Sequence, residues 1–212
     1  MAHPGNPPKQ PDYLGRHLRE HQTEERTRST SAPDRALEAR EHVLDPRYPA
    51  TVIIDLPEGV DPIMHVWGEM VPHIGVAASR FSQSVYAHTT LGLREFEAAR
   101  LRIAQINGCV LCQDWRTERD GQRVEETFPD AVAAWRTTTD LDERGRLAAE
   151  YAERFALDHH GLDEDFWGRM RGAYSDAEIV ELSMCLGSWI AFGRLNRVLG
   201  LDTACRLPST AH

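Results

Sequence analysis

Two cysteines three residues apart, Cys109 and Cys112, are the part of this sequence whose residue types most directly allow chemistry. They form the only Cys-x-x-Cys pair in the chain. On a helix, a separation of three places both sulfurs on one side, within reach of a disulfide bond. A cysteine in the first turn of a helix also faces unsatisfied N–H groups and the positive end of the helix dipole, which favour the thiolate. The pair is therefore suited to dithiol and disulfide cycling.

Two other interpretations of the pair stay open from the sequence. Free cysteines often pack as small hydrophobic side chains without any redox use. A zinc site would need two more ligands, and the adjacent His159 and His160 do not have metal-site spacing. The sequence has no HExxH motif and no glycine-rich phosphate loop, so we predict neither a metal nor an organic cofactor.

An amphipathic helix must position the pair, and residues 93–107 directly before it have that pattern. Its apolar positions, which recur at steps of three and four on one helix face, are Phe96, Ala99, Ile103 and Ile106. Residues 89–92 are predicted to be a break with a capping hydroxyl. Asn107-Gly108 closes the helix, since glycine permits the left-handed cap conformation. If the chain reverses there, the helix and the cysteine segment form a helical hairpin.

Glu97 lies in this helix, twelve residues before the first cysteine. In one continuous helix that separation would span about 18 Å, too far for an effect on the thiols. In the hairpin, Glu97 instead lies opposite residues 116–118, so we predict an ion pair between Glu97 and Arg116. Arg116 is also four residues after Cys112, on the same helical face as that thiol. A salt bridge of Arg116 to Asp114 is the alternative.

Capping residues and prolines mark further helices. These start signals are Asp61-Pro62, Pro72, Asp140 with Glu143, and Ser175 with Glu178. We predict helices from residue 61, at 72–88, 93–107, 109–120 and 130–136, from 140 to a close at Gly161, around 166–170, and at 175–199. Between residues 182 and 192 the last helix is nearly apolar all round, which predicts a central, closely packed position in the core or a subunit interface. The predicted fold is all-α.

The first fifty residues have a different composition. Residues 1–50 hold seven of the twelve prolines, with many charged and few large apolar side chains. Such a segment cannot bury enough apolar surface to offset its ordering entropy, so we predict an extended polar arm, disordered or wrapped around a partner. Residues 51–56 are predicted to form a short strand or an extended lead-in. We place one all-α domain at residues 51–207, since a chain of 212 residues suffices for a single core.

The formal net charge of −9 and the isoelectric point near 5.6 disfavour a broad cationic surface. Nucleic acids and anionic membranes both require such a surface, so we expect neither as a partner. The first residues lack the regions of a signal peptide, and the longest apolar run is too short to span a bilayer. We therefore predict a cytoplasmic protein, in which a Cys-x-x-Cys is more typical of redox chemistry or metal binding than of a structural disulfide.

Three segments of the sequence together resemble the carboxymuconolactone decarboxylase and alkylhydroperoxidase D superfamily. They are Glu97, the run Ala-Gln-Ile-Asn-Gly-Cys-Val-Leu-Cys, and the late helix from Tyr-Ser-Asp-Ala-Glu-Ile-Val-Glu-Leu to Gly-Arg-Leu-Asn-Arg. The resemblance covers roughly residues 62–202. It implies an all-α fold, a homo-oligomer (dimer, trimer or hexamer) and cofactor-free thiol peroxidase activity. By this resemblance Cys112 attacks an organic hydroperoxide, Cys109 is the resolving thiol, Glu97 belongs to a proton relay, and an external dithiol restores the pair.

The sequence departs from the family pattern after the second cysteine. The family's alkylhydroperoxidases have a histidine four residues after it, where this chain has Arg116. Arginine stays protonated, so Arg116 can stabilise a Cys112 thiolate and pair with Glu97 but cannot accept a proton. His88 could supply the missing imidazole from just before the helix, and Trp115 is a candidate for lining a pocket.

The first hypothesis for the function is therefore a thiol-dependent peroxidase or disulfide reductase. An alternative is a non-catalytic helical oligomer that senses redox state or serves as a structural unit, and the arginine at position 116 favours it. A decarboxylase of small lactone acids is a third interpretation, against which the Cys-x-x-Cys pair argues.

Overall fold

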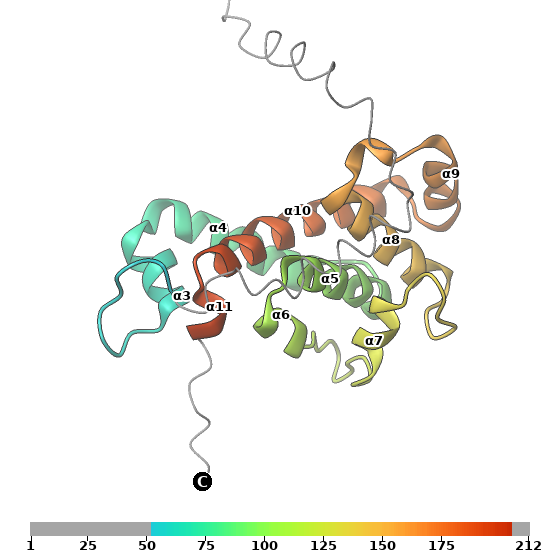
Figure 1. Cartoon of the computed structure of the whole chain (residues 1–212). Helices are drawn as coiled ribbons and strands as arrows, with labels where there is room; N and C mark the ends of the chain where they lie inside the picture. The colour runs from blue at the N-terminus through green and yellow to red at the C-terminus, as the bar shows by residue number, and fades with distance from the viewer. Residues whose placement is uncertain (1–51, 205–212) are drawn as a thin grey trace, which may run out of the picture. The chain divides into compact units, whose positions relative to one another are not determined.

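The computed structural model of this chain describes residues 52–204, which form helices joined by turns and loops (Figure 1). In chain order these are α3 (Pro62–Met64), the π-helix η1 (His65–Met70), α4 (Pro72–His88), α5 (Leu93–Asn107), α6 (Val110–Asp114), α7 (Phe128–Ala133), α8 (Glu143–Leu157), the 3-10 helix η2 (His159–Gly161), α9 (Glu164–Ala173), α10 (Asp176–Val198) and α11 (Leu201–Ala204). Apart from a single bridge between Arg119 and Gln122, the described residues contain no β-structure. The all-α prediction is confirmed.

The predicted N-terminal arm, residues 1–50, lies outside the described residues, as do residues 51 and 205–207 of the predicted domain. The lead-in from residue 52 to residue 56 forms no strand. Its one backbone hydrogen bond to a distant helix end runs from the Ile53 N–H to the Leu199 carbonyl, at 3.2 Å.

Local signals set most of the helix starts. The Asp61 carboxylate accepts the Met64 N–H at 2.8 Å, and Pro62 occupies the first helical position. Pro72 likewise occupies the first helical position of α4, where no side chain caps the helix. At the start of α10, Ser175 and Glu178 form the predicted capping box, in which each side chain accepts the backbone N–H of the other residue. These three predicted starts are confirmed.

Two predicted caps and one predicted helix end are wrong. The cap of α8 is Asp142 rather than Asp140, because the Asp142 carboxylate accepts the Gly145 N–H at 2.7 Å. Helix α8 also ends at Leu157, and Gly161 closes the separate 3-10 turn. In the break before α5, the hydroxyls of Thr89 and Thr90 do not cap the helix start but donate to the Glu181 carboxylate on α10, and the Thr89 hydroxyl also accepts the Leu91 N–H.

The predicted helix at 109–120 is also wrong, since α6 spans only Val110–Asp114. The carbonyls of Cys112 and Trp115 accept hydrogen bonds from the Arg100 guanidinium, both at 2.7 Å, and the backbone is extended at Trp115. A continued helix would need the Cys112 carbonyl for its own next turn. Further on, Asp120 and Gly121 have φ values of 54° and 71° and form a turn. Contacts with α5 therefore end this helix, and no local stop signal does.

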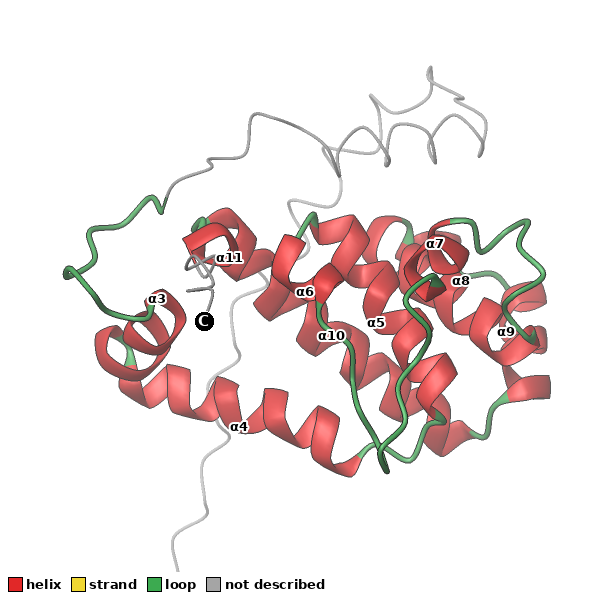
Figure 2. Ribbon diagram, turned by 90° about the horizontal axis from the view of Figure 1, so that it is seen from below, coloured by secondary structure: helices red, strands yellow, loops and turns green. Residues whose placement is uncertain are grey.

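Helix α5 lies at the centre of the described domain. It packs most extensively against α8 and next against α10, while α6 and α7 also contact it (Figures 1 and 2). Every residue from 96 to 105 is buried, so the helix is enclosed on all sides and not on the one predicted face. Its buried charged side chains form ion pairs, either within α5, as with Glu97 and Arg100 at 2.6 Å, or with a neighbouring helix, as with Arg102 and Glu153 of α8 at 2.7 Å. A helix with this burial can hold polar groups away from water.

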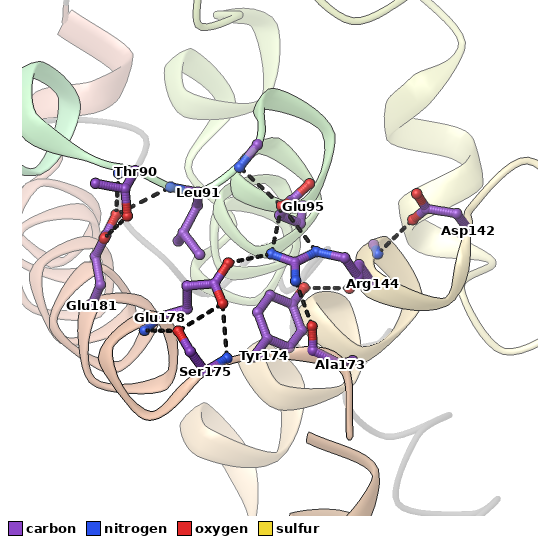
Figure 3. Close-up of polar contacts among 12 residues, drawn as sticks. Thr90, Leu91, Glu95, Asp142, Arg144, Ala173, Tyr174, Ser175, Glu178 and Glu181 are labelled. Carbon is purple, nitrogen blue, oxygen red and sulfur yellow. Dashed lines mark hydrogen bonds and ion pairs between the residues drawn. The ribbon is translucent and has the colours of Figure 1, made fainter. Parts of the chain in front are cut away.

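One arginine ties the starts of three helices together (Figure 3). Arg144, in the first turn of α8, donates to Glu95 of α5 at 2.9 Å and to Glu178 of α10 at 2.7 Å. It also donates to the Ala173 carbonyl at the end of α9. The Ser175 N–H and the Arg144 guanidinium together hold the pKa of Glu178 at about 2. The three helices that carry most of the core are thus fixed at one end by shared charges.

Helix α10 is half core and half surface. Leu182, Cys185, Leu186 and Trp189 are buried as predicted, but Met184 on the opposite side is 59% exposed. Residues 182–192 of this helix are therefore nearly apolar all round without being covered all round. Within residues 52–204 no helix is both long enough and apolar enough to cross a membrane.

Candidate functional site

The two cysteines of the Cys-x-x-Cys pair form a disulfide, with 2.03 Å between the sulfurs. Cys109 is the cap residue of α6, and its sulfur accepts the Cys112 N–H at 3.3 Å. Cys109 is only 1% exposed, whereas Cys112 is partly exposed. The structure is thus the oxidised form of the pair, and Cys112 is the sulfur that solvent or a ligand can reach.

The Asn107-Gly108 turn places the pair beside α5. Gly108 has a φ of 65°, and the N–H groups of Gly108 and Cys109 return to the carbonyls of Gln105 and Ala104, each at 3.1 Å. This is the left-handed helix close expected of an Asn-Gly sequence. The predicted chain reversal at this point is confirmed.

Helix α10 holds this turn from the other side. The Asn107 amide donates to the Trp189 carbonyl at 3.1 Å, and its oxygen accepts from Arg194 at 3.2 Å. At Gly193 an added Cβ would lie 2.9 Å from the Asn107 amide nitrogen, so a larger residue there would have to displace the end of the Asn107 side chain.

Glu97 is fully buried under the cysteine segment, and its partner is not the predicted one. Arg100, one turn along the same helix, donates to both carboxylate oxygens, at 2.6 and 2.9 Å. The Thr117 hydroxyl donates to the same carboxylate at 2.5 Å. The predicted position opposite residues 116–118 is therefore right, while the predicted Glu97–Arg116 ion pair is wrong. Arg100 reaches Glu97 at i, i+3 spacing without crossing the hairpin.

The Arg116 guanidinium instead donates to the backbone carbonyls of Gln113 and Trp115. The predicted alternative, a salt bridge to Asp114, is also absent from the ion pairs of the described residues. Arg116 thus caps the end of α6 with its charge and is not part of the Glu97 cluster.

Arg100 is the functional residue that sequence reasoning missed. Besides Glu97, its guanidinium binds the carbonyls of Cys112 and Trp115 and lies 5.1 Å from the centre of the Trp115 ring. One side chain therefore connects the buried carboxylate to the backbone of the reachable cysteine. The i, i+3 spacing of Glu97 and Arg100 on the predicted helix was the signal in the sequence that could have indicated this ion pair.

A cavity of about 300 Å³ lies beside the disulfide, and Cys112 forms part of its wall. Residues of α3, η1, α4, α5 and α10 line the rest of this cavity, which is open to solvent on one side, and they include Tyr86, Arg100 and Trp189. Burial raises the pKa of Tyr86 to about 12, so its hydroxyl stays neutral and can donate a hydrogen bond at ordinary pH. His88 is exposed and is not among the cavity-lining residues, and Trp115 does not line the cavity either but packs against Tyr86 with 5.2 Å between ring centres.

The other sulfur and metal chemistry weighed from the sequence is not found here. Cys185 is buried in α10 and, because of that burial, the pKa of its thiol is raised to about 12. Cys205 lies outside the described residues. Within residues 52–204, no three His, Cys, Asp or Glu side chains are placed to hold a metal ion together.

Comparison with solved structures gives a match in fold. A protein of unknown function from Agrobacterium tumefaciens, described as a candidate antioxidant defence protein AhpD, matches with a TM-score of 0.52 and 21% sequence identity. The match covers 61% of this chain and 90% of the other. The helical domain therefore has the alkylhydroperoxidase D-like fold. No protein-family model matches the sequence, and a search of curated proteins finds no match.

Proposed function

We propose that the protein is a thiol-dependent peroxidase that reduces organic hydroperoxides with the Cys109–Cys112 pair. The observation that carries the proposal is the unequal exposure of a bonded cysteine pair at a cavity. Cys112 borders the cavity, and Cys109, bonded to it, is buried. The alkylhydroperoxidase D-like fold supports the same activity, as does the description of the Agrobacterium tumefaciens protein.

The reaction uses the pair in two steps. In the reduced protein the Cys112 thiolate attacks one oxygen of the hydroperoxide, so that an S–O bond forms, the O–O bond breaks, and the alkoxide takes a proton and leaves as the alcohol. The Cys109 thiolate then attacks the Cys112 sulfur, forming the disulfide and releasing hydroxide, which takes a proton to become water. An external dithiol reduces the disulfide and is itself oxidised. The net reaction converts hydroperoxide and dithiol to alcohol, water and a second disulfide.

The buried residues Glu97 and Arg100 contribute to this chemistry by positioning the segment that carries Cys112. Both oxygens of Glu97 are occupied by Arg100, and one also by Thr117, so we assign Glu97 a positioning role rather than a direct proton transfer. Arg100 in turn holds the Cys112 carbonyl, which limits the movement of that cysteine between its reduced and oxidised forms. Arg116 stays a candidate for stabilising the thiolate through its charge alone.

The test is a thiol count on the reduced protein before and after one equivalent of cumene hydroperoxide. The wild type should fall from four free thiols to two. Cys109→Ser should instead accumulate a sulfenic acid at Cys112, trapped by dimedone, and Cys112→Ser should consume no peroxide. Cys185→Ser is the matched control, since that cysteine is buried and apart from the pair. Full turnover by Cys112→Ser would refute the proposal.

A second candidate function is a non-catalytic unit that responds to oxidation. It is favoured by the hydrogen bonds that engage both oxygens of the Glu97 carboxylate, together with arginine at position 116. This candidate predicts no peroxide turnover with any of several dithiols, and a change in oligomer size when the disulfide forms.

We also propose that the chain forms a homo-oligomer. Helices α4 and α10 pack against each other and leave large apolar side chains in solvent, among them Ile74 at 73% exposure and Met184 at 59%. Exposed apolar surface of this kind is typical of an interface with another protein. The expected partner is a second copy of this chain, and light scattering of the purified protein measures the number of copies.

A further inference from the structure

The reaction proposed above needs a group that gives up a proton beside Cys112. Breaking the O–O bond releases an alkoxide, which is a strong base, into the cavity. Arg100 and Arg116 do not serve as the donor, because arginine keeps its proton in proteins. Glu97 forms an ion pair with Arg100, so it holds no proton to give. The donor is therefore another side chain of the cavity wall, or water.

Tyr86 is the phenol of this cavity wall. It lies on α4 and lines the cavity together with Cys112. Three aromatic rings hold it in place, with 5.6 Å between ring centres to Phe96, 5.2 Å to Trp115 and 6.4 Å to Trp189. The other hydroxyls of the wall belong to serines, which, as alcohols, are no stronger acids than the alcohol product. A phenol is a much stronger acid, so Tyr86 has the hydroxyl best suited to protonate an alkoxide.

The surroundings of the Tyr86 hydroxyl suit a donor that is neutral before the reaction. Burial, and to a smaller extent the charge of Glu97, raise the pKa of Tyr86 to about 12, so that it retains its proton at ordinary pH. The positive charge of Arg100 and a hydrogen bond with Trp189 act in the opposite direction. Since an indole N–H can only donate, Trp189 binds the phenol oxygen and leaves the hydroxyl proton for another acceptor. The same two neighbours stabilise the phenolate that remains when this proton is transferred.

We propose that Tyr86 is a catalytic proton donor, which protonates the alkoxide that leaves when the Cys112 thiolate attacks the hydroperoxide. The S–O bond to Cys112 forms as the O–O bond breaks, and the oxygen that leaves takes the hydroxyl proton of Tyr86 to become the alcohol. The phenolate of Tyr86 then takes a proton from water, which reaches the cavity through its open side. The inference rests on the proposed peroxidase function and adds a catalytic residue to it.

The experiment compares two oxidants that differ in whether their leaving group needs a proton. The first, tert-butyl hydroperoxide, releases an alkoxide, whereas the second, peracetic acid, releases acetate, a weak base that leaves without one. One equivalent of each is mixed with the reduced full-length protein, and the rate of disulfide formation between Cys109 and Cys112 is measured by rapid quenching. Tyr86→Phe removes the hydroxyl and keeps the ring with its aromatic contacts. Tyr151→Phe is the matched control, since the Tyr151 hydroxyl is bonded to that of Ser183 at 2.7 Å and Tyr151 does not line the cavity.

With tert-butyl hydroperoxide, Tyr86→Phe should form the disulfide about a hundredfold more slowly than the wild type, as is usual when a positioned acid is lost. With peracetic acid its rate should stay within about threefold of the wild type, which also shows that the variant is folded, and Tyr151→Phe should match the wild type with both oxidants. Equal slowing with both oxidants would give Tyr86 a structural role, and an unchanged rate with tert-butyl hydroperoxide would make water the donor; either result overturns this inference alone. Wild-type protein that forms no disulfide with tert-butyl hydroperoxide would remove the proposed peroxidase function, and the role of Tyr86 with it.

Discussion

Replacing Glu97 by glutamine should destabilise the protein far more than the same replacement at Glu125. Both carboxylates are paired with an arginine through more than one hydrogen bond, Glu97 with Arg100 and Glu125 with Arg94. They differ in their surroundings, because the side chains of Glu97 and Arg100 are 0% and 3% exposed, and those of Glu125 and Arg94 are 47% and 42% exposed. The comparison therefore isolates the effect of burial on an Arg–Glu pair.

The magnitude follows from what each substitution leaves behind. Glu97→Gln leaves the Arg100 charge buried without its counter-charge, for which about 3–5 kcal/mol is expected. Glu125→Gln leaves Arg94 in water, at about 0.2–1 kcal/mol. With a urea dependence of about 2 kcal/mol per molar, the unfolding midpoint should fall by about 2 M in the first variant and by less than about 0.5 M in the second.

The assay is urea unfolding of the oxidised proteins, followed by far-UV circular dichroism with the disulfide intact in every sample. Equal and small shifts in the two variants would contradict the account of Glu97 as an enclosed, fully occupied carboxylate. A large shift in Glu125→Gln would contradict the role given to burial.

Three further outcomes are expected. A double-mutant cycle on Glu97 and Arg116 in the same urea assay should give a coupling energy within about 0.5 kcal/mol of zero, because the two side chains do not meet. On acidification the free energy of unfolding should fall between about pH 4.5 and pH 2, and less so in Glu178→Gln. The folded pKa of Glu178 is about 2, below its ordinary value, so its contribution is full above the unfolded pKa and is lost as the pH drops through the folded one. Met184→Glu should reduce the oligomer to smaller species in light scattering while circular dichroism stays helical, and an unchanged mass would remove the proposed interface.

Local sequence rules predict those parts of the fold that nearby residues decide. Asp61-Pro62, Ser175 with Glu178, and Asn107-Gly108 each act within one helical turn, and each has its predicted role in the structure. The predicted chain reversal at Gly108 also places Glu97 correctly, opposite residues 116–118, where the Thr117 hydroxyl donates to its carboxylate. Such features follow from hydrogen bonds between residues three or four apart.

The rest depends on contacts between distant segments. Helix α6 stops early because Arg100, twelve residues before Cys112, takes the carbonyls at its end. A charged residue such as Arg100 is ordinarily expected to face solvent. It is buried here only because other helices pack around α5, and the sequence does not show that packing. The cavity wall joins residues of α3, η1, α4, α5, α6 and α10, so neither its position nor its volume can be seen in the sequence.

The contact between Gly193 and Asn107 has a consequence for how this chain can vary. In a library of α10 variants selected for disulfide formation between Cys109 and Cys112, large side chains at position 193 should be depleted relative to glycine. A Cβ there would lie 2.9 Å from the Asn107 amide nitrogen, so the amide would have to move away from the Trp189 carbonyl that it binds. The position of the turn before Cys109 thus depends in part on the small size of Gly193, a residue of α10 that is far from the cysteine pair in the sequence.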